Sequence, residues 1–176
     1  MKRVKYLILI FALTTFSIYI LAENSAIVRY LEGKAYVQGA SSEERELLTI
    51  NSPIFEGDNI WLTEGNMGIL FTDGTIIWLS TDSHIEISQF PYPYSEKPLG
   101  LKASLWRGMA VLEAKFPVPT ESSHIIITPS ASVRTARKSL AIIEVENVDR
   151  TRLTVLDGSA IISSGGYSNT VWTNQM

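Results

Sequence analysis

The stretch Glu56–Ile87, EGDNIWLTEGNMGILFTDGTIIWLSTDSHIEI, constrains the fold of this chain more than any other. It holds four short apolar runs, each flanked by a polar turn signal that contains Gly, Asp, Asn or Ser. Asp73-Gly74 lies between two of these runs and is typical of a hairpin turn in which both central residues take positive φ. Runs this short and this rich in Ile, Trp and Phe favour strands over helices. The stretch therefore predicts a tight meander or coil of strands.

The same pattern continues on both sides of this stretch. Apolar runs bounded by turn residues predict two strands around Gly33, and the glycines before Tyr167 predict a final hairpin. Further strands are predicted at 101–116, 124–128, 141–145, 153–156 and 160–162. The expected fold class is all-β: an elongated, solenoid-like or sandwich-like body of short antiparallel or coiled strands. We interpret the following residues as structural turn formers: Gly33, Gly57, Asp58, Asp73, Gly74, Gly108, Asp157 and Gly158.

The first 22 residues have the pattern of a secretory leader. Met1–Lys5 is basic, Tyr6–Leu21 is almost wholly apolar, and Ala22 offers a small residue at the cleavage position. We interpret 1–22 as a signal peptide or, alternatively, as an uncleaved N-terminal anchor. The remainder, 23–176, is then one exported domain in a periplasmic or extracytoplasmic location. Any contact with a membrane is expected only through this N-terminal segment.

Composition limits the chemistry of the exported part. Removing 1–22 takes away three of the 15 Lys and Arg residues and none of the 18 Asp and Glu residues, which leaves a formal charge of −6. An acidic domain of this kind is not expected to bind nucleic acid or an anionic membrane surface. The chain has no cysteine, which excludes disulfides, a thiol nucleophile and a thiolate metal site.

No residue pattern in the chain indicates catalysis, a cofactor or a bound metal. The sequence Asp82-Ser83-His84 contains the residue types of a catalytic triad, but neighbours on a strand point to opposite faces. His124 lacks the further ligands that a metal site needs. Four aspartates could offer carboxylates for catalysis or Ca²⁺ binding, although three lie beside Gly or Asn, where Asp commonly forms turns: Asp58, Asp73, Asp82 and Asp157. We therefore expect a protein that is not an enzyme.

Two clusters are candidates for contact with a partner. Arg134, Arg137 and Lys138 form the only local basic cluster, which is either a docking patch for an acidic partner or cell-wall anion, or a solvated turn. Tyr92 and Tyr94 lie among prolines in 89–100, which is either a recognition loop or a connection whose rings pack on the body. The tryptophans are interpreted as core or rim residues, of which an exposed subset could anchor a partner: Trp61, Trp78, Trp106 and Trp172.

Several motifs, taken in their order along the chain, resemble the FecR domain family of bacterial extracytoplasmic regulators. They are Leu31–Val37, Gly57–Ile60 with Thr63–Gly65, Leu70–Thr75, Leu105–Gly108 with Phe116, Thr128–Ala131 and Val155–Ala160. The likeness spans 26–162. It implies an all-β, solenoid-like body that acts by protein contact and without catalysis.

Two features depart from the family pattern. Arg137–Ala141 stands where the family usually has Arg-Gly-Thr followed by an aromatic residue. Regulator members also carry a cytoplasmic anti-sigma domain before their membrane span, whereas only five residues precede the apolar run here. We therefore do not expect a direct anti-sigma role for this chain alone.

These observations lead to three hypotheses about function. The first is a FecR-like domain that binds another envelope protein, in signalling or as a scaffold, for instance by adding a strand at an exposed sheet edge. The alternative is a cell-wall module that binds peptidoglycan or another glycan through Trp, Tyr and the basic cluster. The third is a hydrolase that uses Asp73 or Asp82.

Overall fold

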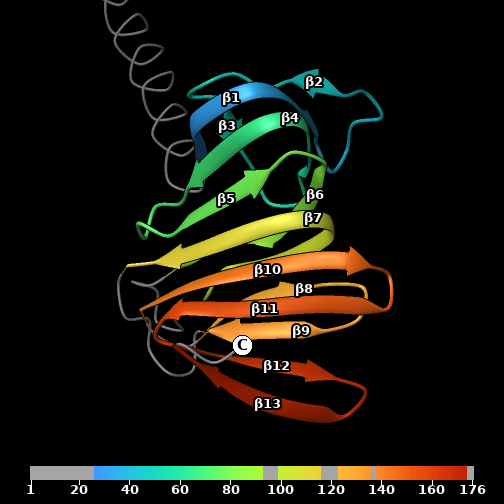
Figure 1. The fold of residues 1–176 in the computed structure, drawn as a ribbon. Helices are drawn as coiled ribbons and strands as arrows, with labels where there is room; N and C mark the ends of the chain where they lie inside the picture. Colours follow the sequence, from blue (N-terminus) through green and yellow to red (C-terminus); the bar gives the residue numbers. More distant parts are fainter. Residues whose placement is uncertain (1–25, 93–98, 116–122, 136–137, 174–176) are drawn as a thin grey trace, which may run out of the picture.

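The computed structural model describes residues 26–92, 99–115, 123–135 and 138–173, which form thirteen strands linked by hydrogen bonds into one sheet (Figure 1). These residues contain no helix, so the all-β prediction is confirmed, and no helix able to cross a membrane occurs among them. The strands are β1 (Ala26–Gln38), β2 (Glu46–Leu47), β3 (Pro53–Ile54), β4 (Asn59–Leu70), β5 (Ile76–Ser80), β6 (Ser83–Gln89), β7 (Lys102–Ala114), β8 (His124–Ile127), β9 (Ser132–Thr135), β10 (Ser139–Asn147), β11 (Arg150–Asp157), β12 (Ser159–Ser164) and β13 (Tyr167–Trp172).

The three longest strands bend at a glycine with positive φ. Gly33 in β1 and Gly65 in β4 lie opposite each other, with φ of 94° and 87°, and Gly108 has the same role in β7 with φ of 85°. A Cβ atom on Gly33 would overlap the Glu64 carbonyl group, so only glycine allows the two strands to approach this closely. The strands therefore continue through these glycines, so the predicted turns at Gly33 and Gly108 are wrong: both residues lie inside long strands.

The bends divide the sheet into two layers. In the front layer of Figure 1, the first half of β1 and the second half of β4 are followed by β5, the second half of β7, β10 and β11. In the back layer, the other halves of these long strands pair with β2, β6 and β8, and β9, β12 and β13 follow. Pairing also closes a ring through β4, β5, β7 and β6.

The core lies between the layers and is built from rows of side chains that follow the strand register. One row crosses the whole front layer, and every member is buried: Val28, Ile69, Ile77, Leu112, Ala141 and Val155. A second row in the back layer joins Ile60, Ile85 and Leu105. Because successive strand residues point to opposite faces, the residues between these positions form the outer surfaces of the two layers.

The two ends of the body differ. At the first end, Leu48 and Ile54 are buried beneath β1, and the short strands β2 and β3 lie along the edge of β1. At the other end, the back layer has four strands beyond β7, namely β8, β9, β12 and β13, whereas the front layer has only β10 and β11. The hairpin β12–β13 therefore extends past the front layer (Figure 1).

Candidate interaction surface

A row of large apolar side chains crosses the outer surface of the front layer. Strand register places Tyr30, Gly68, Trp78, Val111 and Ile142 next to one another on β1, β4, β5, β7 and β10. Tyr30 is 42% exposed, and Trp78, Val111 and Ile142 are partly exposed. We call this set the apolar row. Five adjacent strands contribute to it, so it is a continuous surface.

Apolar side chains also line both sides of the apolar row. Ile27, Leu70 and Ile76 follow a parallel line on β1, β4 and β5, in which Glu113 of β7 separates Ile76 from Leu140 of β10, and Met109 lies on the other side. The five apolar residues are partly exposed. We call these residues, together with the apolar row, the apolar face. Contiguous exposed apolar surface of this kind is uncommon on soluble proteins and marks interaction sites.

Gly68 fixes the position of Trp78. A Cβ atom at Gly68 would lie 2.8 Å from Cζ3 of the indole, so the absence of a side chain lets the ring lie flat against β4. The ring of Tyr30 packs against the indole with a centroid distance of 6.0 Å, and Trp78 Nε1 donates a hydrogen bond to Glu113 Oε2 at 3.2 Å. Trp78 is thus a rigid, partly exposed aromatic group, which is the type of residue that dominates binding energy at interfaces.

A shallow groove of about 350 Å³ opens on this surface. Tyr30, Trp78, Met109 and Val111 supply its apolar walls, and Asn66 and Ser80 supply polar groups at one end. Its position makes Trp78 and Tyr30 accessible to a partner side chain. The groove can therefore accept an apolar anchor from another protein.

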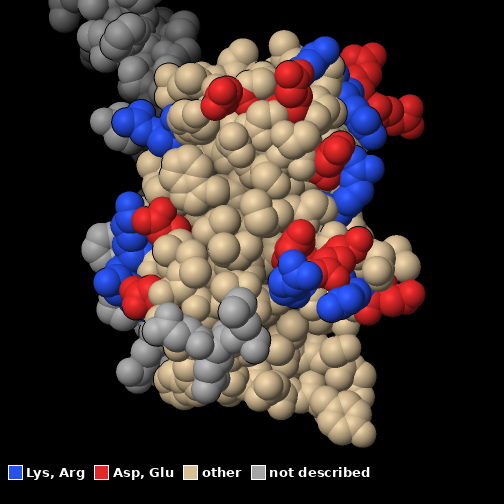
Figure 2. Space-filling view, viewed as in Figure 1, with Lys and Arg blue, Asp and Glu red and all other residues tan. Residues whose placement is uncertain are grey.

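Charged residues lie on two sides of the apolar row. Lys115 and Glu113 form an ion pair of 3.3 Å beside Trp78, while Arg152 pairs with Glu144 at 3.2 Å beyond Ile142. Figure 2 shows the resulting pattern, with Lys, Arg, Asp and Glu gathered at the sides and an uncharged area between them. An apolar centre with a polar rim is the usual anatomy of a protein interface.

The described members of the two predicted interaction clusters lie away from the apolar row. Arg134 is exposed on β9 in the back layer, and Lys138 forms an ion pair of 3.7 Å with Asp157. Tyr92 packs against the core, and its hydroxyl donates to Glu56 Oε1 at 3.2 Å; burial raises its pKa, and Glu56 raises it further. The remaining members, Arg137 and Tyr94, lie outside the described residues.

The turn aspartates bond within their own turns or to a neighbouring segment. Asp73 accepts hydrogen bonds from the backbone and hydroxyl of Thr75 at 2.9 and 2.8 Å, and Asp82 pairs with Arg107 at 2.9 Å. Among the predicted turn glycines, Gly57, Gly74 and Gly158 also have positive φ, between 81° and 87°. Local hydrogen bonds of this kind are typical of structural turns.

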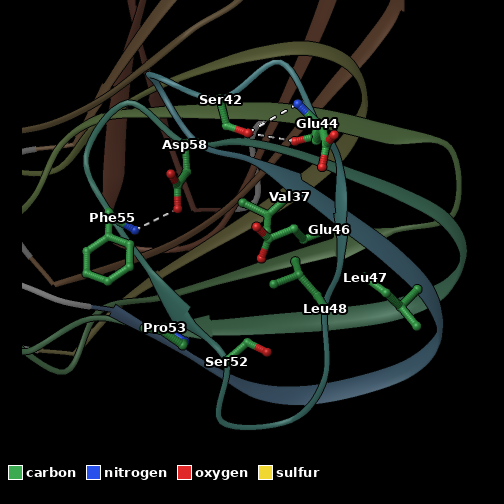
Figure 3. A pocket seen from close by; sticks show the side chains of 11 residues that line it. Val37, Ser42, Glu44, Glu46, Leu47, Leu48, Ser52, Pro53, Phe55 and Asp58 are labelled. Atoms are coloured by element: carbon green, nitrogen blue, oxygen red, sulfur yellow. Dashed lines mark hydrogen bonds between the residues drawn. The ribbon is translucent and has the colours of Figure 1, made fainter.

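Asp58 lies in the wall of a cavity of about 270 Å³ at the first end of the body (Figure 3). Asp58 is 4% exposed, and its Oδ2 accepts a hydrogen bond of 2.8 Å from the Phe55 backbone. Burial raises its pKa, and Glu46 acts in the same direction. In the part of the chain that the structure describes, no group of three or more His, Asp or Glu could hold a metal ion. The cavity is lined by residues of the segment between β1 and β4 and by Val37 of β1.

The two histidines occupy different environments. His124 is fully buried on β8, where Nδ1 accepts a hydrogen bond of 3.1 Å from the Leu101 backbone. Burial lowers its pKa and keeps the ring neutral. His84 stacks on Trp61 at 4.6 Å on the outside of the back layer, and the Arg45 guanidinium lies 3.9 Å from the centre of the same indole. The Trp61 ring thus contacts two neighbouring side chains, His84 and Arg45.

The sequence indicates Trp78 as a possible anchor but contains no local pattern that marks the surface around it. The other members of the apolar row, Tyr30, Gly68, Val111 and Ile142, lie 31 to 112 residues from one another along the chain. The signal that was available is the alternation Ile76, Trp78 and Ser80, which places these three side chains on one side of a strand opposite the buried Ile77 and Leu79.

Comparison with known proteins places the fold but not a family. No protein-family description and no curated protein matches the chain. It is similar to two crystal structures of a "putative anti-sigma factor" from Parabacteroides distasonis ATCC 8503, each with a TM-score of 0.53, at 14% and 15% sequence identity. The likeness covers 66% of this chain and 51% of the other, so it spans about half the length of those structures. At these identities it shows the fold alone.

Proposed function

We propose that this chain is an exported, non-enzymatic, FecR-like module that binds another protein of the bacterial envelope through the apolar face. The observation that carries the proposal is the apolar row on five adjacent strands with ion pairs at its rim. The structural likeness to a "putative anti-sigma factor" supports a role in regulation or signalling. The partner has a complementary apolar surface, and its binding requires no reaction at this chain.

Trp78 is the expected centre of the interface. Its ring is held by Gly68, Tyr30 and Glu113, so it loses little conformational freedom when a partner covers it. Aromatic anchors of this type typically cost about 2 kcal/mol or more of binding free energy when they are truncated. The flanking ion pairs contribute orientation and a salt-dependent association rate.

Site-specific photocrosslinking tests this proposal. A photoreactive phenylalanine derivative is placed at position 78, and at position 106 as a matched control, because Trp106 is a tryptophan on β7 that is 46% exposed. Crosslinking is done in intact cells of the source organism, and products are identified by mass spectrometry. We expect one defined envelope protein to be captured at position 78 and not at position 106.

The captured protein is then purified and its affinity is measured directly. Val111→Lys places a charge in the middle of the apolar face, and Trp78→Ser removes the anchor; both should weaken binding at least about 30-fold, while Trp106→Ser should not. Equal capture at positions 78 and 106, or unchanged affinity in both variants of the apolar face, would rule out this surface as the interface.

Glycan binding is the second candidate, and an aromatic and basic row on the back layer favours it. Register places Tyr36, Trp61, His84 and Arg107 in line across β1, β4, β6 and β7. Co-sedimentation with purified peptidoglycan that is weakened by Trp61→Ala or Arg134→Ala would support this function. If the chain does not sediment with peptidoglycan, or if neither change affects its sedimentation, protein binding remains as the only candidate function.

A further inference from the structure

The C-terminal hairpin differs from the rest of the molecule in its lack of charge. The chain contains 33 Lys, Arg, Asp and Glu residues, yet none of them lies between Gly158 and Met176. This range includes both β12 and β13. Figure 2 shows the corresponding end of the molecule free of blue and red side chains among the atoms that face the viewer.

Strand β13 forms one edge of the sheet. Its only partner among the described strands is β12, and Tyr167, Ser168, Asn169 and Thr170 are all exposed. The hairpin turn at Gly165-Gly166 has positive φ at both residues, so Ser164 and Tyr167 form a hydrogen-bonded pair. Alternation along the ladder then directs the backbone N–H and C=O groups of Ser168 and Thr170 away from β12, towards the open edge.

The other edges of the sheet carry features that discourage strand pairing. Strands β2 and β3 have two residues each, and β3 begins with Pro53. Strand β11 carries Arg150 and Arg152, which form ion pairs with Glu146 and Glu144. Short length, proline and charge are the usual protections of an edge strand. Strand β13 has six residues and none of these protections.

We propose that β13 is a homodimerisation strand, which pairs antiparallel with β13 of a second copy of this chain across a two-fold axis. Strand β13 can pair with the same strand of a second copy without repulsion, because it has no charged residue that would lie near the same charged residue across the two-fold axis. With Asn169 at the axis, Ser168 lies opposite Thr170 of the second copy, and these are the residues whose backbone groups point to the open edge.

The same register brings apolar groups together. Tyr167, which is 85% exposed, lies opposite Val171 of the second copy on the inner face of the hairpin. An aromatic residue opposite a β-branched residue is a favourable cross-strand pair. The two back layers then form one continuous sheet. Because a six-residue strand contributes a contact smaller than a standard interface, the dimer forms reversibly and depends on protein concentration.

Analytical ultracentrifugation of the purified full-length chain over a wide concentration range tests the proposal. Thr170→Pro removes an N–H that points to the open edge and leaves the β12 ladder intact, and Thr170→Lys adds an edge charge. Thr72→Lys is the matched control, because Thr72 is exposed in the turn between β4 and β5. We expect wild type and Thr72→Lys to dimerise, and both Thr170 variants to weaken dimerisation at least about tenfold.

A cysteine experiment tests the register. The chain has no cysteine, so Asn169→Cys places one thiol at the axis, where opposing Cα atoms about 4.5 Å apart allow a disulfide. Tyr167→Cys is the control, because in this register position 167 lies opposite Val171 of the second copy, and the two thiols at position 167 of the dimer do not face each other. Mild oxidation should link the Asn169→Cys chains into dimers far faster than the Tyr167→Cys chains. Equal rates would contradict the register.

Three outcomes would overturn the proposal. The first is a wild-type chain that stays monomeric at all concentrations, which would mean that β13 does not pair with a second copy of this chain. The second is a dimer that Thr170→Pro and Thr170→Lys do not weaken. The third is a dimer that Val111→Lys abolishes, because self-association would then use the apolar face. Circular dichroism of each variant confirms that a loss of dimer is not a loss of fold.

Discussion

Replacing Gly33 with alanine is expected to destabilise the protein strongly, because this glycine allows β1 and β4 to bend together. Its φ of 94° is costly for any residue with a side chain, by about 1–3 kcal/mol. The new methyl group would also overlap the Glu64 carbonyl, so the strands must separate and lose at least one or two hydrogen bonds of about 1 kcal/mol each. The sum is roughly 2–5 kcal/mol, a large part of the stability of a typical domain.

Gly165→Ala is the matched control for this prediction. Gly165 also has positive φ, 54°, but an added Cβ would meet no atom within 4 Å. This variant should lose only the cost of the left-handed conformation, about 1–2 kcal/mol. Both changes restrict the unfolded chain equally, so that effect cancels in the comparison. The difference between the variants therefore isolates the close approach of the strands.

Thermal and urea unfolding followed by circular dichroism measures both variants. For a chain of this size, about 2–4 °C of Tm corresponds to 1 kcal/mol, so Gly33→Ala should melt roughly 4–20 °C below wild type. Gly65→Ala meets the Glu32 carbonyl across the same rung, and the double variant should cost less than the two single changes together. If Gly33→Ala loses no more stability than Gly165→Ala, the paired glycines do not determine the bend.

Three further predictions concern single sites. Gly68→Val should lift the Trp78 ring from β4, which a red shift of tryptophan emission would report; unchanged emission relative to wild type would contradict the packing. Burial keeps the pKa of His124 in the folded protein below its value in the unfolded chain. In a His84→Gln background, the unfolding free energy should therefore fall as the pH drops below about 6.5, by at most about 1.4 kcal/mol per pH unit. An unfolding free energy that does not change between about pH 7.5 and 5.5 would refute this. Arg107→Ala breaks an exposed ion pair with Asp82 and should change stability in urea by less than about 1 kcal/mol.

Much of the fold could be predicted from the sequence because its strands are short and their turns are local. Asp73-Gly74 lies in the turn between β4 and β5, although only Gly74 has the positive φ that was predicted for both residues. Gly165-Gly166 forms the turn between β12 and β13, with positive φ at both residues. The strands predicted at 141–145 and 153–156 lie within β10 and β11. In each case, the residues that determine the conformation are neighbours in the chain.

Two features could not be predicted from local pattern. A glycine with positive φ is typical of a turn, and its role inside a strand depends on a second glycine opposite it, as Gly33 and Gly65 show. The apolar face depends on register across five strands, which a single sequence does not specify. For the basic cluster, closeness in sequence was misleading. Arg134 and Lys138 are near each other in the chain, but Lys138 forms an ion pair with Asp157 of β11.

The bends also explain how one small body presents two independent surfaces. Because β1, β4 and β7 each cross from one layer to the other, the outer side of the front layer is rigidly joined to the back layer, whose last strand is β13. The apolar face lies on β1, β4, β5, β7 and β10, and the open edge belongs to β13, so a partner and a second copy would not compete for the same residues. Sites without shared residues usually contribute additively. The affinity for a partner protein should therefore be the same in Thr170→Pro as in wild type, whereas Val111→Lys should leave dimerisation unchanged.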